Sequence, residues 1–230
     1  MTSLRSPTLR LRARGPFACF TRPELKVERV SYPVMTPSAA RGLLEAVLWK
    51  PAIAWHIERI KVLKEIKFTA FRRNEVNSKA LLPKASTIQQ GGAVPPYFAD
   101  EDRAQRNTVA LSDVDYVIEA YFMMTDKAGT EDNVTKFVEM FNRRVEKGQH
   151  FHQPYFGCRE FVAEVIPADD APSPSMEPRD LGLMLWDIRF SDEGNTPIFF
   201  PARLENGVLE VPTDPDQTLV ATGSSDGGAA

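Results

Sequence analysis

The chain has 230 residues, of which 43% are apolar, and a formal net charge of −3. Its length is typical of one large domain with or without a small addition, and its apolar share is sufficient for a packed core. No apolar run is long enough to span a bilayer, and the basic residues near the N-terminus are followed by no apolar segment. We therefore expect neither a membrane span nor a secretory signal, but a soluble cytoplasmic protein.

The charges are distributed unevenly along the chain. Residues 1–90 contain 17 Lys and Arg against 6 Asp and Glu, residues 91–167 contain 8 against 13, and residues 168–230 contain 3 against 12. A basic block of this size indicates a protein that binds polyanions such as nucleic acid. A solvated basic surface without such a partner would give the same totals.

The sequence contains no recognisable cofactor or metal motif. Cys19 and Cys158 are far apart and outside any C-x-x-C pattern, so we expect two buried thiols and no metal site. Gly-rich phosphate loops, H-E-x-x-H and Ser/His/Asp signatures are also missing. We therefore expect no cofactor.

The first elements follow from apolar spacing. Alternation from Leu9 to Arg14 predicts a half-buried strand, which Gly15-Pro16 should end or bend. Thr36 as N-cap and Pro37 as first residue predict a helix that stops before Pro51. A second strand is expected over about 57–68, and residues 71–107, rich in Pro, Gly, Ser and Lys, form a long insertion that is functional or disordered.

The later elements complete a βαββαβ order. Residues 114–123 have strand composition, a helix capped by Asp132 or Asn133 should extend to Gly148, and residues 158–166 alternate as a strand. This order predicts an α+β fold of the ferredoxin-like or RNA-recognition-motif type for residues 1–167. Residues 168–212 should form a small C-terminal antiparallel β-sheet packed on that domain, and residues 213–230 a disordered tail.

A protein that binds RNA can also cleave it without a metal. The RNA's own 2'-hydroxyl can attack the neighbouring phosphorus if a base, an acid and a cation are in place. His150 and His152 stand at alternate positions, so both rings could face one groove or both could be surface residues. His56 lies in an apolar stretch and is expected to be structural. Lys136 stands four residues after Asp132, which by itself indicates a solvated helix lysine.

Four stretches resemble the CRISPR-associated endoribonuclease of subtype I-C, a member of the RAMP superfamily. They are GPFACFTRPELKVERVSYPVMTPSAARGLLEAVLWKPAIAW, FRRNEVNSK, VDYVIEAYFMMTDKAG and GQHFHQPYFGCREF. The resemblance implies a modified RNA-recognition-motif domain and metal-independent cleavage at the base of a CRISPR repeat hairpin. It also implies retention of the 5' handle of the guide RNA within a Cascade-type complex with other subunits.

The catalytic residues of the family match this chain only in part. Lys136 matches the functional lysine, but Leu48 stands where relatives have a tyrosine or histidine, and Phe137 where they have a histidine. Other candidates for proton transfer are His150, His152, Tyr155 and Tyr32.

Candidate contacts to RNA phosphates and bases are Arg22, Lys26, Arg29, Arg72, Arg73, Asn74 and Lys79. Three functions stay open: a nuclease with altered proton carriers, a subunit that only binds the handle, and a ferredoxin-like domain that binds a small molecule. The basic block disfavours the third.

Overall fold

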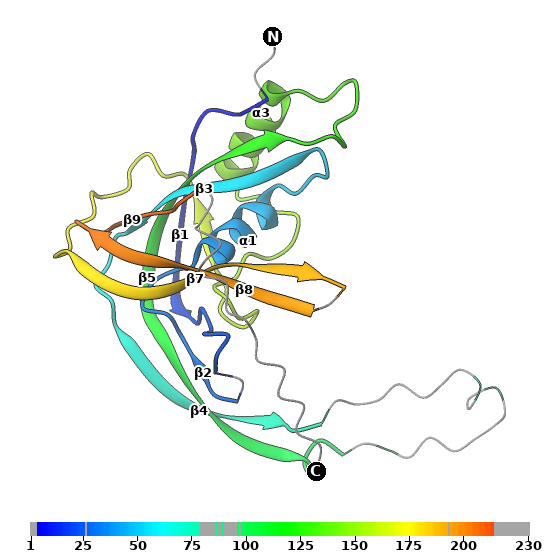
Figure 1. The fold of residues 1–230 in the computed structure, drawn as a ribbon, viewed down its shortest axis with the longest axis vertical. Helices are drawn as coiled ribbons and strands as arrows, with labels where there is room; N and C mark the ends of the chain where they lie inside the picture. The colour runs from blue at the N-terminus through cyan, green and yellow to red at the C-terminus, as the bar shows by residue number, and fades with distance from the viewer. Residues whose placement is uncertain are drawn as a thin grey trace.

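One curved β-sheet organises the molecule (Figure 1). The computed structural model describes residues 4–25, 27–78, 86, 89, 96, 98–192 and 194–213. Strand β5 (Arg103–Met124) has 22 residues and runs through the middle of the sheet. It pairs with β1 on one side and with both β3 and β4 on the other. The sheet therefore depends on β5 as its central strand.

The strand order is β6-β1-β5-β3-β9-β8-β7, and β2 and β4 also pair with β5. All pairings are antiparallel except that of β2 with β5. The other strands are β1 (Leu9–Ala18), β2 (Arg29–Val30), β3 (Ile53–Val62), β4 (Phe68–Val76), β6 (Glu164–Ile166), β7 (Arg179–Ser191), β8 (Gly194–Glu205) and β9 (Val208–Glu210).

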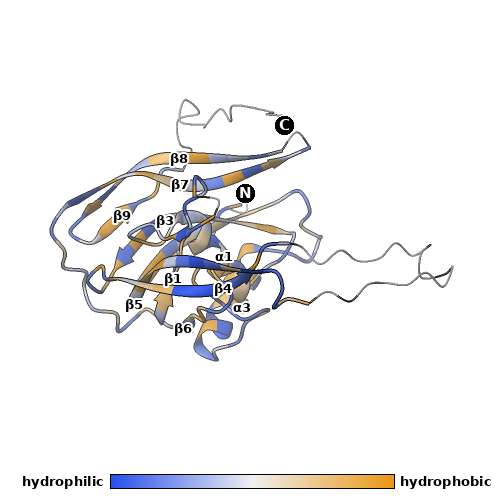
Figure 2. Ribbon diagram, turned by 90° about the horizontal axis from the view of Figure 1, so that it is seen from below, coloured by the Kyte–Doolittle hydropathy of each residue, from blue (hydrophilic) through white to orange (hydrophobic). Residues whose placement is uncertain are grey.

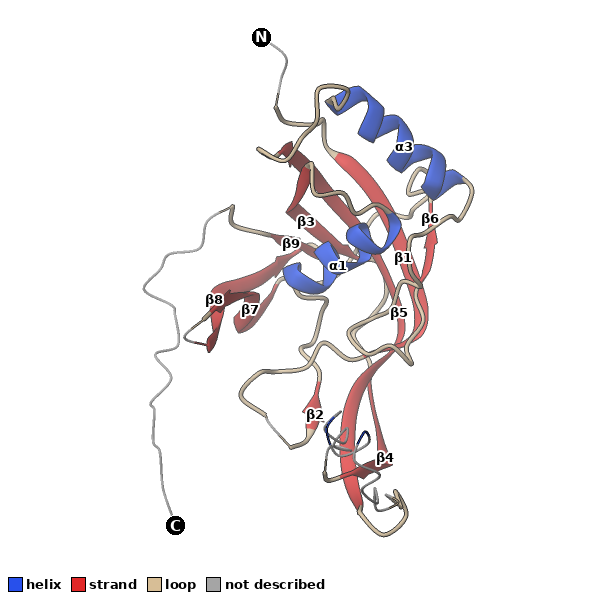
Figure 3. Cartoon of the chain, turned by 90° about the vertical axis from the view of Figure 1, so that its right-hand side faces the viewer, coloured by secondary structure: helices blue, strands red, loops and turns tan. Residues whose placement is uncertain are grey.

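Two helices pack on one face of this sheet (Figure 3). The helices are α1 (Pro37–Val47), capped by Thr36, and α3 (Val134–Glu146), capped by Asn133. Trp55 of β3 contacts both helical regions, because its ring lies 5.1 Å from that of Phe141 and its indole nitrogen donates to Leu48 O at 3.0 Å. Among the described residues, no helix is both long enough and apolar enough to cross a membrane.

The opposite face of the sheet is charged. Glu119 of β5, only 5% exposed, pairs with Arg59 at 2.7 Å, Lys61 at 2.5 Å and Arg10 at 3.5 Å. Arg12 pairs with a second buried carboxylate of β5, that of Asp115, at 2.7 Å. Carboxylates from the middle of the chain thus neutralise part of the basic N-terminal block.

Several strand boundaries differ from the predictions. Strand β1 continues through Gly15-Pro16 to Ala18, because the glycine there makes room rather than a turn. A Cβ at Gly15 would lie 2.9 Å from both the Phe156 ring and Val162 O. The predicted second strand begins earlier, as β3 at Ile53, and ends at Val62.

The flanks of the predicted insertion form an arm rather than a loop. Strand β4 pairs with the first half of β5 from Phe68↔Leu111 to Val76↔Arg103. Its residues alternate between half-buried and exposed, and Figure 2 shows much of it in hydrophilic colours. Most of the segment between 79 and 97 lies outside the described residues.

The C-terminal strands β7, β8 and β9 are antiparallel, as predicted, but they continue the main sheet. Arg59, Ile60 and Lys61 of β3 pair with Glu210, Leu209 and Val208 of β9. The predicted strand over 158–166 is much shorter, since only Glu164–Ile166 forms β6. The predicted tail beyond residue 213 lies outside the described residues.

Candidate nucleic-acid interface

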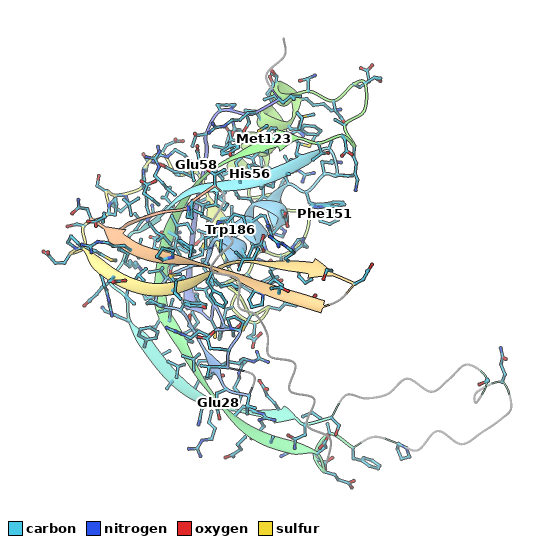
Figure 4. All side chains as sticks on the ribbon, in the orientation of Figure 1. Glu28, His56, Glu58, Met123, Phe151 and Trp186 are labelled. Atoms are coloured by element: carbon cyan, nitrogen blue, oxygen red, sulfur yellow. The ribbon has the colours of Figure 1, made fainter. Side chains whose placement is uncertain are left out.

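The end of α1 meets α3 and the segment that follows it. Phe151 N donates to Ala46 O at 2.6 Å, and Arg144 Nη1 donates to Val47 O at 2.6 Å. These bonds satisfy carbonyls that a helix end leaves without a partner. The exposed Phe151 projects from this junction (Figure 4). Trp49, which follows α1 directly, is 52% exposed.

Lys136 lies in the first turn of α3 with its side chain exposed. Its ammonium is 2.9 Å from Asp132 Oδ1 and 3.5 Å from Glu131 O. The hydrogen bond from Lys136 lowers the pKa of Asp132, with smaller contributions from the Gly129 amide and the charge of Lys50. The Lys136 ammonium is therefore paired with one carboxylate at the surface of the protein.

The two positions without the implied proton carriers belong to the core. Leu48 is 0% exposed and Phe137 is 2% exposed. The Phe137 ring lies 6.3 Å from that of Phe122, which in turn lies 5.3 Å from Trp55. These side chains stabilise the fold and offer no group for proton transfer.

His152 and Tyr155 line a cleft of about 360 Å³ beside α1. Its lining also includes Glu45, a titratable residue that the sequence analysis missed. Burial raises the pKa of Glu45, while the charges of Arg41 and His152 act in the opposite direction. The sequence signal that could have revealed Glu45 is that it is the single acidic residue of the largely apolar helix α1. His150 is exposed and does not belong to this lining.

The structure does not place Lys136 together with the two histidines. Lys136 is in the first turn of α3, whereas His150 and His152 follow its last turn. From Lys136 to Glu146 the helix rises about 15 Å. The cation and the cleft are thus two separate groups on one side of the molecule.

Tyr32 is 1% exposed and carries the Arg22 guanidinium 4.8 Å from its ring centroid. Burial, followed by the charge of Glu24, raises the pKa of Tyr32 to about 12. The described geometry therefore gives no support for a proton-transfer role of this residue.

Among the candidate RNA-binding residues, the arginines differ in their partners. Arg29 pairs with Glu75 at 3.0 Å and with Glu160 at 3.5 Å, and Arg73 also pairs with Glu160. Arg22 pairs with Glu24 at 3.5 Å. Arg72 and Asn74 are exposed on β4, and Arg72 forms no ion pair with another described residue. Lys26 and Lys79 lie outside the described residues.

The cysteines and acidic residues provide no metal centre in the part of the chain that is described. Cys19 and Cys158 are both buried and unbridged, as predicted. They meet in space, since Cys158 Sγ lies 3.9 Å from Cys19 O.

Comparison with known proteins places this arrangement in a family. A family model described as "CRISPR-associated protein (Cas_Cas5)" matches residues 8–212. The chain is 52% identical over 213 residues to a protein of Mannheimia succiniciproducens named "CRISPR pre-crRNA endoribonuclease Cas5d", covering 89% of this chain and 94% of that protein. A Thermus thermophilus protein of the same name is 40% identical over 230 residues, which cover 92% of this chain and 94% of that protein.

Solved structures share the fold. A structure titled "Crystal Structure of CRISPR-associated Protein" matches with a TM-score of 0.70 and 20% identity, covering 96% of this chain and 100% of that one. The crystal structure of a functionally uncharacterized protein from Streptococcus mutans matches with a TM-score of 0.65 and 22% identity, and the match covers 92% of this chain and 95% of that one. The family match and the two close relatives show that the chain belongs to the Cas5d family of CRISPR-associated proteins.

Proposed function

We propose that this protein is an endoribonuclease that cuts CRISPR precursor RNA and stays bound to the 5' handle of the product in a type I-C surveillance complex. One observation carries the proposal: 52% identity across nearly all of a relative named as a pre-crRNA endoribonuclease. The substrate is the repeat transcript, and the partners are the guide RNA and the other subunits of the complex.

The cut uses the 2'-hydroxyl of the RNA as nucleophile and needs no metal. Lys136 stabilises the negative charge that develops on the phosphate, as a cation fixed near the reacting group can. Its exposed position in the first turn of α3 supports this role. A base and an acid must come from residues other than Leu48 and Phe137. His152 and Tyr155 share a cleft, but this cleft lies beyond the last turn of α3 and not beside Lys136. His150 is exposed and Tyr32 is buried, so mutagenesis has to identify the base and the acid.

The fold proposed for residues 1–167 is ferredoxin-like, with an RNA-recognition-motif arrangement. Support comes from the strand order β6-β1-β5-β3, with α1 between β1 and β3 along the chain and α3 between β5 and β6. That order is what a βαββαβ chain gives when its four strands form one antiparallel sheet.

RNA binding is proposed along β4 and the loop before α1. Arg72 and Asn74 have the strongest support, because both are exposed. Arg22, Arg29 and Arg73 must exchange or share their carboxylate partners to reach phosphates. Lys26 and Lys79 stay sequence-based proposals.

The decisive experiment incubates the purified protein with its own repeat RNA in the presence of EDTA. The expected result is a single cut that leaves a 2',3'-cyclic phosphate end. A cut that appears only after a divalent metal is added would reject the metal-free mechanism. No cut in any buffer would reject the nuclease altogether.

A second function is favoured by the burial of Leu48 and Phe137. Without those two proton carriers, the protein would only bind the handle as a structural subunit. This alternative predicts tight, salt-dependent binding to handle RNA and copurification with the complex, with no cleavage product.

A further inference from the structure

The cleft beside α1 has the size of a small-molecule site. Its volume of about 360 Å³ lies within the range of roughly 300–1,000 Å³ that is usual for ligand pockets. Helix α1 forms one wall and the segment from His152 to Gly157 forms the other. Gly42, Glu45 and Ala46 line it from α1, and His152, Tyr155 and Gly157 from the opposite wall.

Both walls are held by backbone contacts, so the cleft is preformed. His152 N donates to Ala46 O at 3.3 Å, and Cys19 N donates to Phe156 O at 3.0 Å. Gly157 has φ +78°, and a Cβ there would lie 2.0 Å from Cys19 O. The second wall therefore lies directly against the end of β1 and cannot shift without breaking these contacts.

Gly42 lies in the middle of α1, where packing does not require a glycine. A Cβ added to Gly42 would meet no atom within 4 Å. Glycine is less favourable than alanine in a helix interior, because it loses more conformational freedom on folding. Gly42 therefore lowers the stability of α1 at the point where the helix backbone lines this cleft without a side chain. Close approach of a ligand to a backbone is a reason for such a glycine.

The polar groups of the cleft suit a nucleobase. The Glu45 carboxylate, one turn after Gly42 along the cleft, is half-exposed and lies 3.7 Å from Arg41 Nε, so it has oxygens left to accept hydrogen bonds from a ligand. Carboxylates accept from the exocyclic amino groups of bases, as Glu and Asp do from cytosine. His152 and Tyr155 supply rings of the kind on which unstacked RNA bases stack.

We propose that this cleft binds one unstacked nucleotide of single-stranded RNA whose base carries an exocyclic amino group, with the base against Gly42 and its amino group donating to Glu45. The proposal rests on the proposed function, since it says where one nucleotide of the bound RNA is held. It places that nucleotide beyond the last turn of α3, away from Lys136.

The test uses the full-length protein and fluorescent eight-nucleotide RNAs made only of A, C or U. Wild type should bind oligo(A) and oligo(C) more tightly than oligo(U), which lacks an exocyclic amino group. Gly42→Ala should raise Tm by about 1–4 °C and still weaken binding of oligo(A) and oligo(C) by at least about fivefold. Gly42→Leu should weaken binding further, and Glu45→Leu, which has no hydrogen-bond acceptor, should reduce oligo(A) and oligo(C) to the level of oligo(U).

Asn142→Ala is the matched control, because Asn142 is exposed on α3 and does not line the cleft. It should raise Tm without changing affinity for any oligomer. The inference is overturned if Gly42→Ala leaves RNA affinity unchanged, if it lowers Tm, or if wild type binds no oligomer. The role of Glu45 is overturned if wild type binds all three oligomers with equal affinity and Glu45→Leu does not change that affinity. Cleavage of repeat RNA in EDTA by wild type is scored separately, so loss of the nuclease proposal and loss of this site are distinguishable.

Discussion

Lys136 and Phe137 are neighbours in the first turn of α3 and occupy opposite environments. The Lys136 ammonium is exposed and lies 2.9 Å from Asp132 Oδ1, whereas the Phe137 ring is 2% exposed and packs against Phe122. Successive helix residues point about 100° apart, so one turn can carry a solvated cation and a core side chain. The exposed cation for which we propose phosphate stabilisation is thus followed directly by a side chain of the core.

Replacing Lys136 with alanine should lower repeat-RNA cleavage by about 10²- to 10³-fold, since an isolated catalytic cation commonly contributes that much. Stability should change by less than about 0.5 kcal/mol, because the pair with Asp132 is exposed. Single-turnover cleavage and thermal unfolding measure the two effects. Lys147→Ala, an exposed cation at the other end of α3, is the control. Equal rates for the two variants would remove Lys136 from the mechanism.

Phe137→Ala should destabilise the protein by about 3–5 kcal/mol, the usual cost of removing a buried phenyl ring. The reason is its contact with Phe122 inside the core. Phe151→Ala removes the same side chain from a position that is 69% exposed and should cost less than about 0.5 kcal/mol. Urea unfolding of both variants checks the contrast, and similar midpoints would show that Phe137 is not a core residue.

Arg72 and Arg73 on β4 should respond differently to alanine. Arg73 pairs with Glu160 and donates to Thr108 Oγ1 at 3.2 Å, so Arg73→Ala should cost about 1–2 kcal/mol of stability. Arg72 is exposed, so its removal should leave stability unchanged and weaken binding to handle RNA. The slope of log K against log salt should fall by about 1. An unchanged slope for Arg72→Ala would exclude a phosphate contact.

His56 should make stability sensitive to acid. Burial, followed by the charges of Arg41 and Arg5, lowers the pKa of His56, and its ring stacks 5.1 Å from that of Tyr121. The unfolded chain therefore binds a proton at a higher pH than the folded one. Stability contributed by the neutral ring is present above about pH 6.5 and is lost as the pH falls through the folded pKa.

His56→Phe keeps a ring against Tyr121 but cannot titrate. Urea unfolding between about pH 5 and 8 should show a smaller loss of stability on acidification for this variant than for wild type. Parallel curves for the two proteins would mean that His56 makes no contribution to the acid sensitivity.

The sequence was sufficient to predict helices α1 and α3. Thr36 and Asn133 are N-caps whose side chains accept the backbone amides of Ala39 and Lys136. Capping is a local interaction, so a short stretch of residues contains the complete signal. The apolar stripes that follow these caps also match the buried faces of α1 and α3.

The strands of the arm could not be predicted in the same way. Strand β4 has no fully buried residue, so the apolar alternation that reveals a half-buried strand is absent. Of the two outcomes expected at Gly15-Pro16, the end of the strand does not occur, since the glycine accommodates the Phe156 ring, which comes from a distant part of the chain. Close approaches of this kind are tertiary facts that local spacing does not contain.

The site was predicted unevenly for a related reason. Lys136 was found because a motif marks it, and the structure confirms that it is exposed on α3. Glu45 was missed because its significance comes from residues 107 and 110 positions later, His152 and Tyr155, which complete the same cleft. The roles of these residues stay predictions until cleavage is measured.

The pairing of β9 with β3 also bears on how the protein is made. The outer edge of β3 around Arg59–Lys61 is completed only by Val208–Glu210, about 150 residues further along the chain. During synthesis at about 5–20 residues per second, this edge waits roughly 10–30 seconds for its partner. A nascent chain stalled before residue 208 would present an unpaired strand edge to its neighbours, which is a template for aggregation.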